Sequence, residues 1–217
     1  MKSRITALLF LGFISLGVLL GFNMGGDGPN GSKSNTSSSV PPITIVPQSN
    51  STVTYLDDFN GVNDTTGLKA RGYKVWYRGG GPQGLGATWF QGNATVFAAY
   101  EGAASGYVAA NYQVVNGTNN IDSWLVTPRM SVSSGDTIAF WSRSPDASTF
   151  PDSVRVMYSA VGDSTPEATS WVELGRFKTS TVTWTRSSYR TAAAGANARF
   201  AIRYNVVGGG PNGANSD

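Results

Sequence analysis

The 217-residue sequence contains neither cysteine nor histidine, and these absences remove much of the chemistry that a protein can perform. Disulfides, thiol nucleophiles, Cys/His zinc sites and a Ser-His-Asp triad all need one of these two residues. Acid–base catalysis would have to use carboxylates, Lys or Tyr, and a metal ion would have to be a hard cation held by oxygen atoms. The sequence therefore leaves few residues for catalysis.

Paired carboxylates are the main catalytic option that remains. A glycosidase needs two carboxyl groups that face each other across a cleft. The sequence has three glutamates, Glu101, Glu167 and Glu173, and no motif pairs Glu101 with an aspartate. Since solvated surface carboxylates are far more common, we predict no catalytic residue. A carbohydrate-active hydrolase that uses Glu101 is kept as the alternative.

Oxygen ligands for calcium gather in the segment that begins the globular part. Asp57, Asp58 and Asn60 follow one another closely, with Asn63 a little further on. Carboxylate and amide oxygens suit Ca²⁺, so these residues predict a structural calcium site. The alternative is that Asp and Asn form Asx turns here without any metal.

Aromatic residues around the first glycine-rich segment could bind a ligand. Trp76, Tyr77 and Trp89 flank Gly79–Gly84 and predict an exposed rim on which a sugar could stack, although most such rings belong to the core. Gly79–Gly84 and Gly208–Gly213 both match G-x-G-x-x-G, but the residues after Gly84 are typical of a strand. Because a dinucleotide site needs this motif between a strand and a helix, we interpret both segments as loops at the rim of the fold.

The overall composition favours a secreted β-rich domain. Charged residues make up 13% of the chain, below the usual share of about 25%. The net charge of +3 comes mostly from the N-terminal residues, since 13 basic and 12 acidic residues remain from position 53 onward. This balance argues against nucleic-acid binding.

The N-terminal part predicts export followed by a linker. Lys2 and Arg4 precede the uncharged run Ile5–Phe22, which is typical of an export signal or of an uncleaved membrane anchor formed by an apolar helix. Residues 23–52 are rich in Ser, Gly, Asn and Pro and predict a disordered linker. We therefore divide the chain into 1–22, 23–52 and a globular domain at 53–217. The domain is expected outside the cell, with membrane contact only through residues 5–22.

The globular part shows the two-residue alternation of half-buried strands. In the clearest example, Ala198–Tyr204, Phe200 and its alternate neighbours face inward and two arginines face outward. Other predicted strands are Val53–Phe59, Tyr73–Tyr77, Thr95–Tyr100, Gly106–Ala110, Trp124–Val126, Thr137–Trp141, Ser153–Tyr158 and Thr181–Tyr189. No amphipathic helix is evident, so we predict an all-β, two-sheet antiparallel jelly-roll sandwich.

One ordered set of motifs is similar to a known family. Asp122–Pro128 reads Asp-Ser-Trp-Leu-Val-Thr-Pro and resembles the signature of the cleaved-adhesin, or choice-of-anchor J, domains. The turn at Tyr55–Gly61, the strands around Ile138 and Val154, and the strand at Phe200 follow in the family's order. The chain lacks the Tyr-Ile-x-Ile-Asp strand with which members close, so the resemblance implies a domain that is truncated after Asp217. It also implies the galactose-binding-like jelly-roll fold.

The resemblance implies a non-catalytic adhesion module that stands at a cell surface or accompanies a secreted enzyme. Its expected partner is a glycan or a host or matrix protein, bound by a monomer. A structural spacer without any ligand is the remaining alternative. Within the signature, Trp124 and Leu125 should face opposite sides of a strand, and Pro128 should end its pairing.

Overall fold

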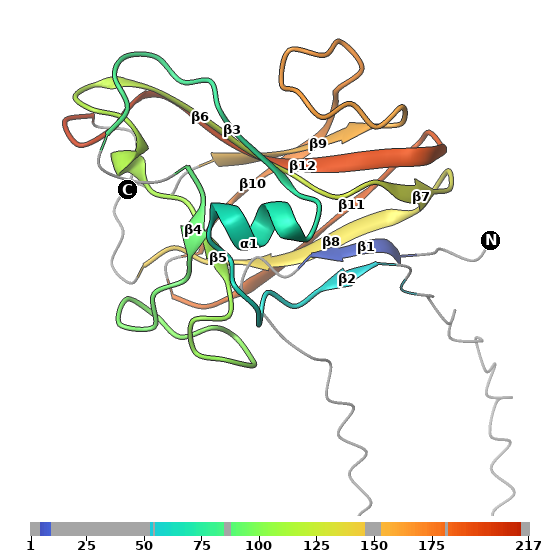
Figure 1. Ribbon diagram of the computed structural model, residues 1–217, viewed down its shortest axis with the longest axis horizontal. Coiled ribbons are helices and arrows are strands. Elements are labelled where there is room, and N and C mark those ends of the chain that lie inside the picture. The colour runs from blue at the N-terminus through green and yellow to red at the C-terminus, as the bar shows by residue number, and fades with distance from the viewer. Residues whose placement is uncertain are drawn as a thin grey trace, which may run out of the picture.

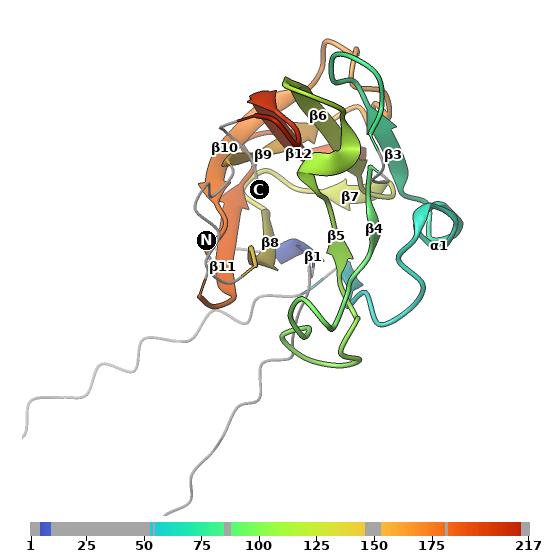
Figure 2. The same ribbon diagram turned by 90° about the vertical axis from the view of Figure 1, so that its left-hand side faces the viewer.

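The structure, a computed structural model, describes residues 5–9, 53, 55–84, 88–145, 153–180 and 182–213, with backbone alone for 5–9. These residues form an all-β protein in which two sheets face each other (Figures 1 and 2). The coarse prediction of a β-sandwich is therefore confirmed.

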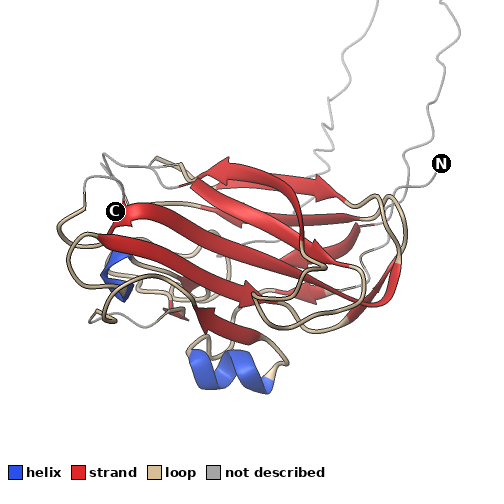
Figure 3. Ribbon diagram, turned by 90° about the horizontal axis from the view of Figure 1, so that it is seen from above, coloured by secondary structure: helices blue, strands red, loops and turns tan. Residues whose placement is uncertain are grey.

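The larger sheet has six strands, and every pairing in it is antiparallel. The longest strand, β12, lies between β9 and β6 and also pairs with β7 beyond them. Figure 3 shows this sheet from above, with the helix α1 beside its β3 edge. Its strands are β3 (Lys74–Tyr77), β6 (Asn119–Val126), β7 (Met130–Val132), β9 (Ser153–Ser159), β10 (Val172–Lys178) and β12 (Gly195–Gly209).

The smaller sheet has four strands in the order β11-β8-β1-β2. The pair β11–β8 is antiparallel, whereas β1 lies between β8 and β2 and is parallel to both. The sequence predicted an antiparallel sandwich, so the two parallel pairings of β1 are a correction to that prediction. The strands are β1 (Ile5–Leu9), β2 (Leu56–Asp57), β8 (Thr137–Ser142) and β11 (Thr185–Arg190).

Short elements close one side of the sandwich. β4 (Phe90–Gln91) and β5 (Val108–Ala109) form a separate antiparallel pair, and η1 (Tyr112–Val114) is a single 3₁₀ turn. The helix α1 (Thr65–Ala70) was not predicted. The Asp64 carboxylate caps it by accepting a hydrogen bond from Gly67 N at 2.7 Å, and Leu68 is buried beneath it. Asp64 followed by Thr65 and Thr66 is a recognisable N-cap signal.

Alternate side chains of the strands fill the core between the sheets. On β12, Phe200 and Ile202 are buried in the main cluster together with Leu125 of β6 and Phe140 of β8. The other face of the larger sheet carries a second cluster around Trp124. Trp124 and Leu125 therefore face opposite sides of β6, and the strand ends at Val126, two residues before Pro128, as predicted.

Several strands differ from the prediction for local reasons. Thr95–Tyr100 is not a strand, because Asn93 Oδ1 accepts hydrogen bonds from both Thr95 N and Thr95 Oγ1 and so starts a turn. The strand β10 was missed; Gly175 interrupts its alternation at a register shift. The predicted strand at Val53–Phe59 shortens to β2.

The N-terminal predictions fall mostly outside the described residues. Ile5–Leu9 form the strand β1, and residues 10–52, which hold the rest of the apolar run and the linker, are not among those described. The apolar helix, the linker and the domain boundaries stay predictions. Among the described residues, no helix has the length and apolar character needed to cross a membrane.

Stability should fall above about pH 10, because burial raises the pKa of several tyrosines above their usual value. The largest rise belongs to Tyr73, which is fully buried and accepts a hydrogen bond from the Tyr55 hydroxyl at 3.2 Å. Below about pH 10 the tyrosine hydroxyls are protonated in both the folded and the unfolded state, so the raised pKa values do not change the stability with pH. Above it the unfolded chain loses protons first, and the folded state becomes less stable.

Urea denaturation from about pH 8 to pH 11 would measure this loss. The control Tyr73→Phe should weaken the dependence, since it removes the strongest contributor. A free energy of unfolding that stays constant over the whole range would contradict the prediction.

Candidate ligand-binding pocket

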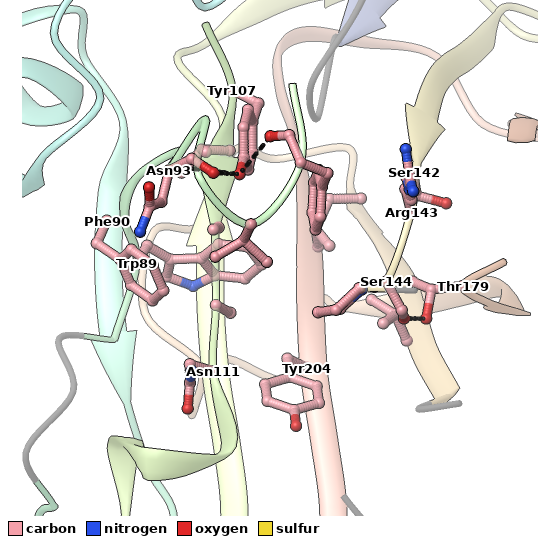
Figure 4. A pocket seen from close by; sticks show the side chains of 18 of the residues that line it. Trp89, Phe90, Asn93, Tyr107, Asn111, Ser142, Arg143, Ser144, Thr179 and Tyr204 are labelled. Carbon is pink, nitrogen blue, oxygen red and sulfur yellow. Dashed lines mark hydrogen bonds between the residues drawn. The ribbon is translucent and has the colours of Figure 1, made fainter. Parts of the chain in front are cut away.

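A cavity of about 280 Å³ lies between the inner face of the larger sheet and the β4–β5 pair. Figure 4 shows Trp89 and Phe90 on one wall and Ser142 and Arg143 on the opposite wall. The size is close to the lower limit of about 300 Å³ for ligand sites. The lining residues come from β4, β5, β8, β9, β10, β12 and the loops that join them.

Aromatic rings form most of the apolar wall. Phe97 stacks on Tyr107 with ring centroids 5.0 Å apart and meets the edge of Trp184 at 5.4 Å. The loop that carries Phe97 is fixed by Tyr107, whose hydroxyl accepts a hydrogen bond from Asn93 N at 2.9 Å. Burial raises the pKa of Tyr107, so this hydroxyl stays protonated near neutral pH. The wall is therefore a fixed apolar surface.

Most polar side chains at the pocket are already engaged within the protein. Asn111 Oδ1 accepts a hydrogen bond from Gln113 N at 2.6 Å, and Asn93 Oδ1 accepts two from Thr95. Ser144 Oγ and Thr179 Oγ1 are hydrogen-bonded to each other. These groups shape the site but have little left to offer a ligand.

The buried polar atoms at the pocket without a hydrogen-bond partner among the described residues include Trp89 Nε1 and Ser142 Oγ. These two residues are only 4% and 5% exposed. An indole N–H can only donate, and leaving a buried donor unpaired costs about 1–3 kcal/mol. A ligand that accepted these hydrogen bonds would recover that free energy.

One charged side chain, Arg143, is among the described residues that line the pocket. Its guanidinium carbon lies 5.0 Å from the centroid of the Phe97 ring. The described lining residues include no Asp or Glu, so they supply no carboxylate pair of the kind that a glycosidase uses.

The three predicted ligand residues do not form one exposed rim. Trp89 lines the pocket, but it is buried, so its prediction as an exposed ring was wrong. Trp76 and Tyr77 are neighbours on β3 and point to opposite sides of the sheet, since Trp76 packs on the outer cluster and Tyr77 on the main core. The structure therefore brings only Trp89 to the candidate site.

Trp76 and the signature tryptophan belong to the outer face of the larger sheet. Trp124 packs against Trp171 at 5.6 Å, and Trp76 Nε1 donates to Ser164 O at 2.6 Å, which fixes the β9–β10 loop over the sheet. Arg203 lies over the Trp124 ring and forms a two-bond ion pair with Asp122, at 2.6 and 2.8 Å. The signature thus has a structural role, as predicted.

The predicted calcium ligands are engaged in Asx turns. Asp57 Oδ1 accepts from Phe59 N at 2.9 Å, and Asp58 Oδ1 accepts from Asn60 N at 3.1 Å. The second oxygen of Asp57 accepts from Arg71 Nε at 3.0 Å, so a cation already lies beside this carboxylate. The Asx turns of the alternative reading are therefore present, and the calcium site stays a prediction.

The two glycine-rich segments form loops, and the described residues show no nucleotide-binding arrangement at either of them. The two glycine-rich loops lie on either side of the turn before β6: Gly80 N donates to Asn120 O at 2.9 Å, and Asn212 N donates to Gly117 O at 3.3 Å. In the described part of the chain, the next element after the first loop is the strand β4, not a helix. Among the described residues, no three Asp or Glu side chains are grouped closely enough to hold a metal ion.

Sequence patterns did not indicate most of the pocket. Phe97, Ser142, Arg143 and Trp184 come from separate loops and strand ends, and no spacing links them. Only the turn signal at Asn93, followed by Thr95, could have shown that Phe97 lies on a folded loop rather than a strand.

Comparisons with known proteins show only that the fold of this chain is similar to that of some solved structures. No family model matches the sequence, and no curated protein matches it. Among solved structures, the chain is similar to the K1 cleaved adhesin domain of Lys-gingipain from Porphyromonas gingivalis W83, with 18% identity over 74% of this chain and 88% of that one and a TM-score of 0.48.

Two further domains of Lys-gingipain are similar at a lower level. The K2 cleaved adhesin domain shows 14% identity over 61% of this chain and 78% of that one, with a TM-score of 0.43. The K3 domain of the P. gingivalis W83 protein shows 19% identity over 57% and 86%, with a TM-score of 0.36. These values are too low to assign a family or a function.

Proposed function

We propose that this protein is a non-catalytic ligand-binding module of the adhesion type. The observation that carries the proposal is the apolar pocket, in which Trp89 Nε1 and Ser142 Oγ have no partner and the described lining residues include no carboxylate. Such a site can hold a projecting apolar group, and its described residues offer no carboxylate pair for hydrolysis. We further propose that the fold is the jelly roll of the cleaved-adhesin type, supported by the ordered motifs of the sequence and the opposed Trp124 and Leu125.

The proposed setting is the outside of the cell, with a glycan or a host or matrix protein as partner. This part rests on the charged N-terminus followed by the uncharged run Ile5–Phe22, on the linker composition, and on the low share of charged residues, 13% of the chain. The pocket would receive either the apolar face of a sugar ring or the end of a side chain that projects from the partner.

A blocked-pocket variant tests the proposal. Ala110 lines the cavity, and Ala110→Phe should fill part of it. We expect the full chain to bind at least one member of a panel of surface glycans and matrix proteins, and Ala110→Phe to reduce that binding about tenfold, since one well-packed ring is worth about 1.5–3 kcal/mol. Surface plasmon resonance on immobilised partners would measure it.

The matched control is Ala192→Phe, which adds the same ring at an exposed position outside the lining. This variant should bind as the unmodified chain does, and both variants should unfold at similar temperatures. Equal binding by Ala110→Phe and the unmodified chain would refute the pocket as the site, and no binding to the whole panel would refute the function.

The hydrolase and the spacer remain distinguishable alternatives. A hydrolase that used Glu101 should lose turnover in Glu101→Gln, but Glu101 is not among the residues that line the cavity. A spacer should show no ligand-dependent rise in melting temperature. The pocket itself favours a ligand over a spacer, because its apolar walls enclose about 280 Å³ beside two buried groups that could donate hydrogen bonds to a ligand.

A further inference from the structure

We infer that Arg199 and Arg129 form a binding site for an oxyanion. The class comprises carboxylate, sulfate and phosphate groups, which share a negative charge and several acceptor oxygens. Two observations carry the inference: one guanidinium is buried without an acid beside it, and a second guanidinium lies next to it. Neither arginine lines the pocket, so this site is separate from the one in the proposed function.

Arg199 is a buried cation without a counter-charge among the described residues. It lies on β12 and is only 7% exposed. Its Nη1 atom donates to Thr127 O, whereas its buried Nε atom has no hydrogen-bond partner in the described part of the chain. No ion pair joins it to a described Asp or Glu. Since arginine stays charged near neutral pH and a buried charge is costly unless it is paired, the site lacks a negative group.

Arg129 brings a second cation to the same place. Met130 lies opposite Ala198 where β7 pairs with β12 (Figure 1), and the two arginines come one position further along the same two segments. Burial, and then the like charge of Arg129, lower the pKa of the Arg199 guanidinium, so the two cations repel each other. An anion bound between them would replace this repulsion with two attractions.

The turn after β9 completes the site. A Cβ atom on Gly162 would touch Asn197 O and lie 3.6 Å from Arg129 Nε, so this turn, the start of β12 and Arg129 lie against one another. The acid of the turn, Asp163, is hydrogen-bonded to a serine hydroxyl and forms no ion pair with a described arginine. Because Arg129 is exposed, we place the anion beside it, at the surface end of the Arg199 side chain.

The donors fit an oxyanion better than a neutral ligand. A guanidinium group presents planar pairs of N–H donors that match two oxygens of a carboxylate, sulfate or phosphate. These charge-assisted hydrogen bonds are about twice as strong as neutral ones. A sugar hydroxyl could accept a hydrogen bond here, but it would leave both positive charges uncompensated.

Thermal unfolding of the full chain in two salts tests the inference. Sodium sulfate or sodium acetate replaces sodium chloride at constant ionic strength. With at least one of them we expect the melting temperature to rise by about 3 °C and to level off below about 20 mM, as the site fills. The general stabilising effect of sulfate grows with concentration and does not saturate in this range. A saturable rise with neither salt would overturn the inference.

Matched variants locate the site. Arg129 and Arg186 are both exposed, and Arg186 lies on β11 of the smaller sheet. Arg129→Gln should weaken binding of the stabilising ion about tenfold, the loss expected for one charge-assisted hydrogen bond. Arg186→Gln removes the same charge and should bind as the unmodified chain does. Equal affinity in these two variants would place the ion elsewhere and overturn the inference.

The buried arginine provides a second check. Arg199→Met keeps an apolar chain of similar length and should abolish the saturable rise, whereas a rise that persists in it would overturn the inference. If this variant does not fold, the comparison of Arg129→Gln with Arg186→Gln still decides.

The choice of salt separates the sources of the anion. A saturable rise with acetate alone would assign the site to planar carboxylates, such as those of acidic side chains. A rise with sulfate alone would assign it to tetrahedral sulfate or phosphate groups. Either result supports the oxyanion site, and neither depends on what the pocket binds.

Discussion

Phe140→Ala is expected to lower the free energy of unfolding by about 3–5 kcal/mol. Phe140 is fully buried on β8, between the two sheets, and its ring lies 4.9 Å from that of Phe177 on β10. The substitution removes the contact between the sheets and leaves a cavity that the strands cannot close. Urea denaturation followed by tryptophan fluorescence would measure the loss.

The control for this prediction is Val207→Ala. Val207 lies on the strand β12 but is 71% exposed, so its truncation should change stability by less than about 0.5 kcal/mol. If Phe140→Ala were as stable as Val207→Ala, the assignment of β8 to the inner face of a two-sheet core would be wrong.

Arg71→Met is expected to cost about 3 kcal/mol, because it leaves the carboxylate of Asp57 buried without its cation. Asp57 is 8% exposed and the Arg71 side chain 30% exposed, so we take the lower end of the range for a broken buried ion pair. The guanidinium also donates to Val62 O and Asn63 Oδ1, both at 2.6 Å, and these bonds hold the segment before α1.

A double variant separates the charge from the packing. Asp57→Asn together with Arg71→Met removes the uncompensated charge, so it should recover part of the stability lost in Arg71→Met alone. Chemical denaturation of the four chains in this cycle would give the coupling between the two residues. Additive losses would show that Arg71 acts through its other contacts, contrary to the prediction.

Strand alternation correctly predicted which apolar side chains of β12 fill the core, but it did not predict which of their polar neighbours are buried. Phe200 and Ile202 are buried as expected, since each strand of a sandwich has one inner face. Arg199 was expected to face solvent, yet it is 7% exposed and donates to Thr127 O. Alternation identifies the face of a residue but not what covers that face.

The pocket could not be predicted because it depends on tertiary placement. Trp89 was chosen as a ligand residue for its position next to a glycine-rich segment, but Arg143 and Ser142 lie at the end of β8 and carry no local signal. Their relation to Trp89 exists only once β8 and β4 face each other across the cavity. The calcium prediction likewise took no account of Arg71, which lies 14 residues after Asp57 and donates a hydrogen bond to its carboxylate.

The indole N–H resonance of Trp89 offers the most direct test of the pocket as a ligand site. The chain has six tryptophans, so a proton–nitrogen correlation spectrum shows a small set of indole signals, and Trp89→Phe identifies the one that belongs to Trp89. Titration with the panel member that binds the full chain should shift this signal and leave that of Trp124, on the other face of the larger sheet, unchanged. A Trp89 signal that stays in place at saturating ligand would contradict the account.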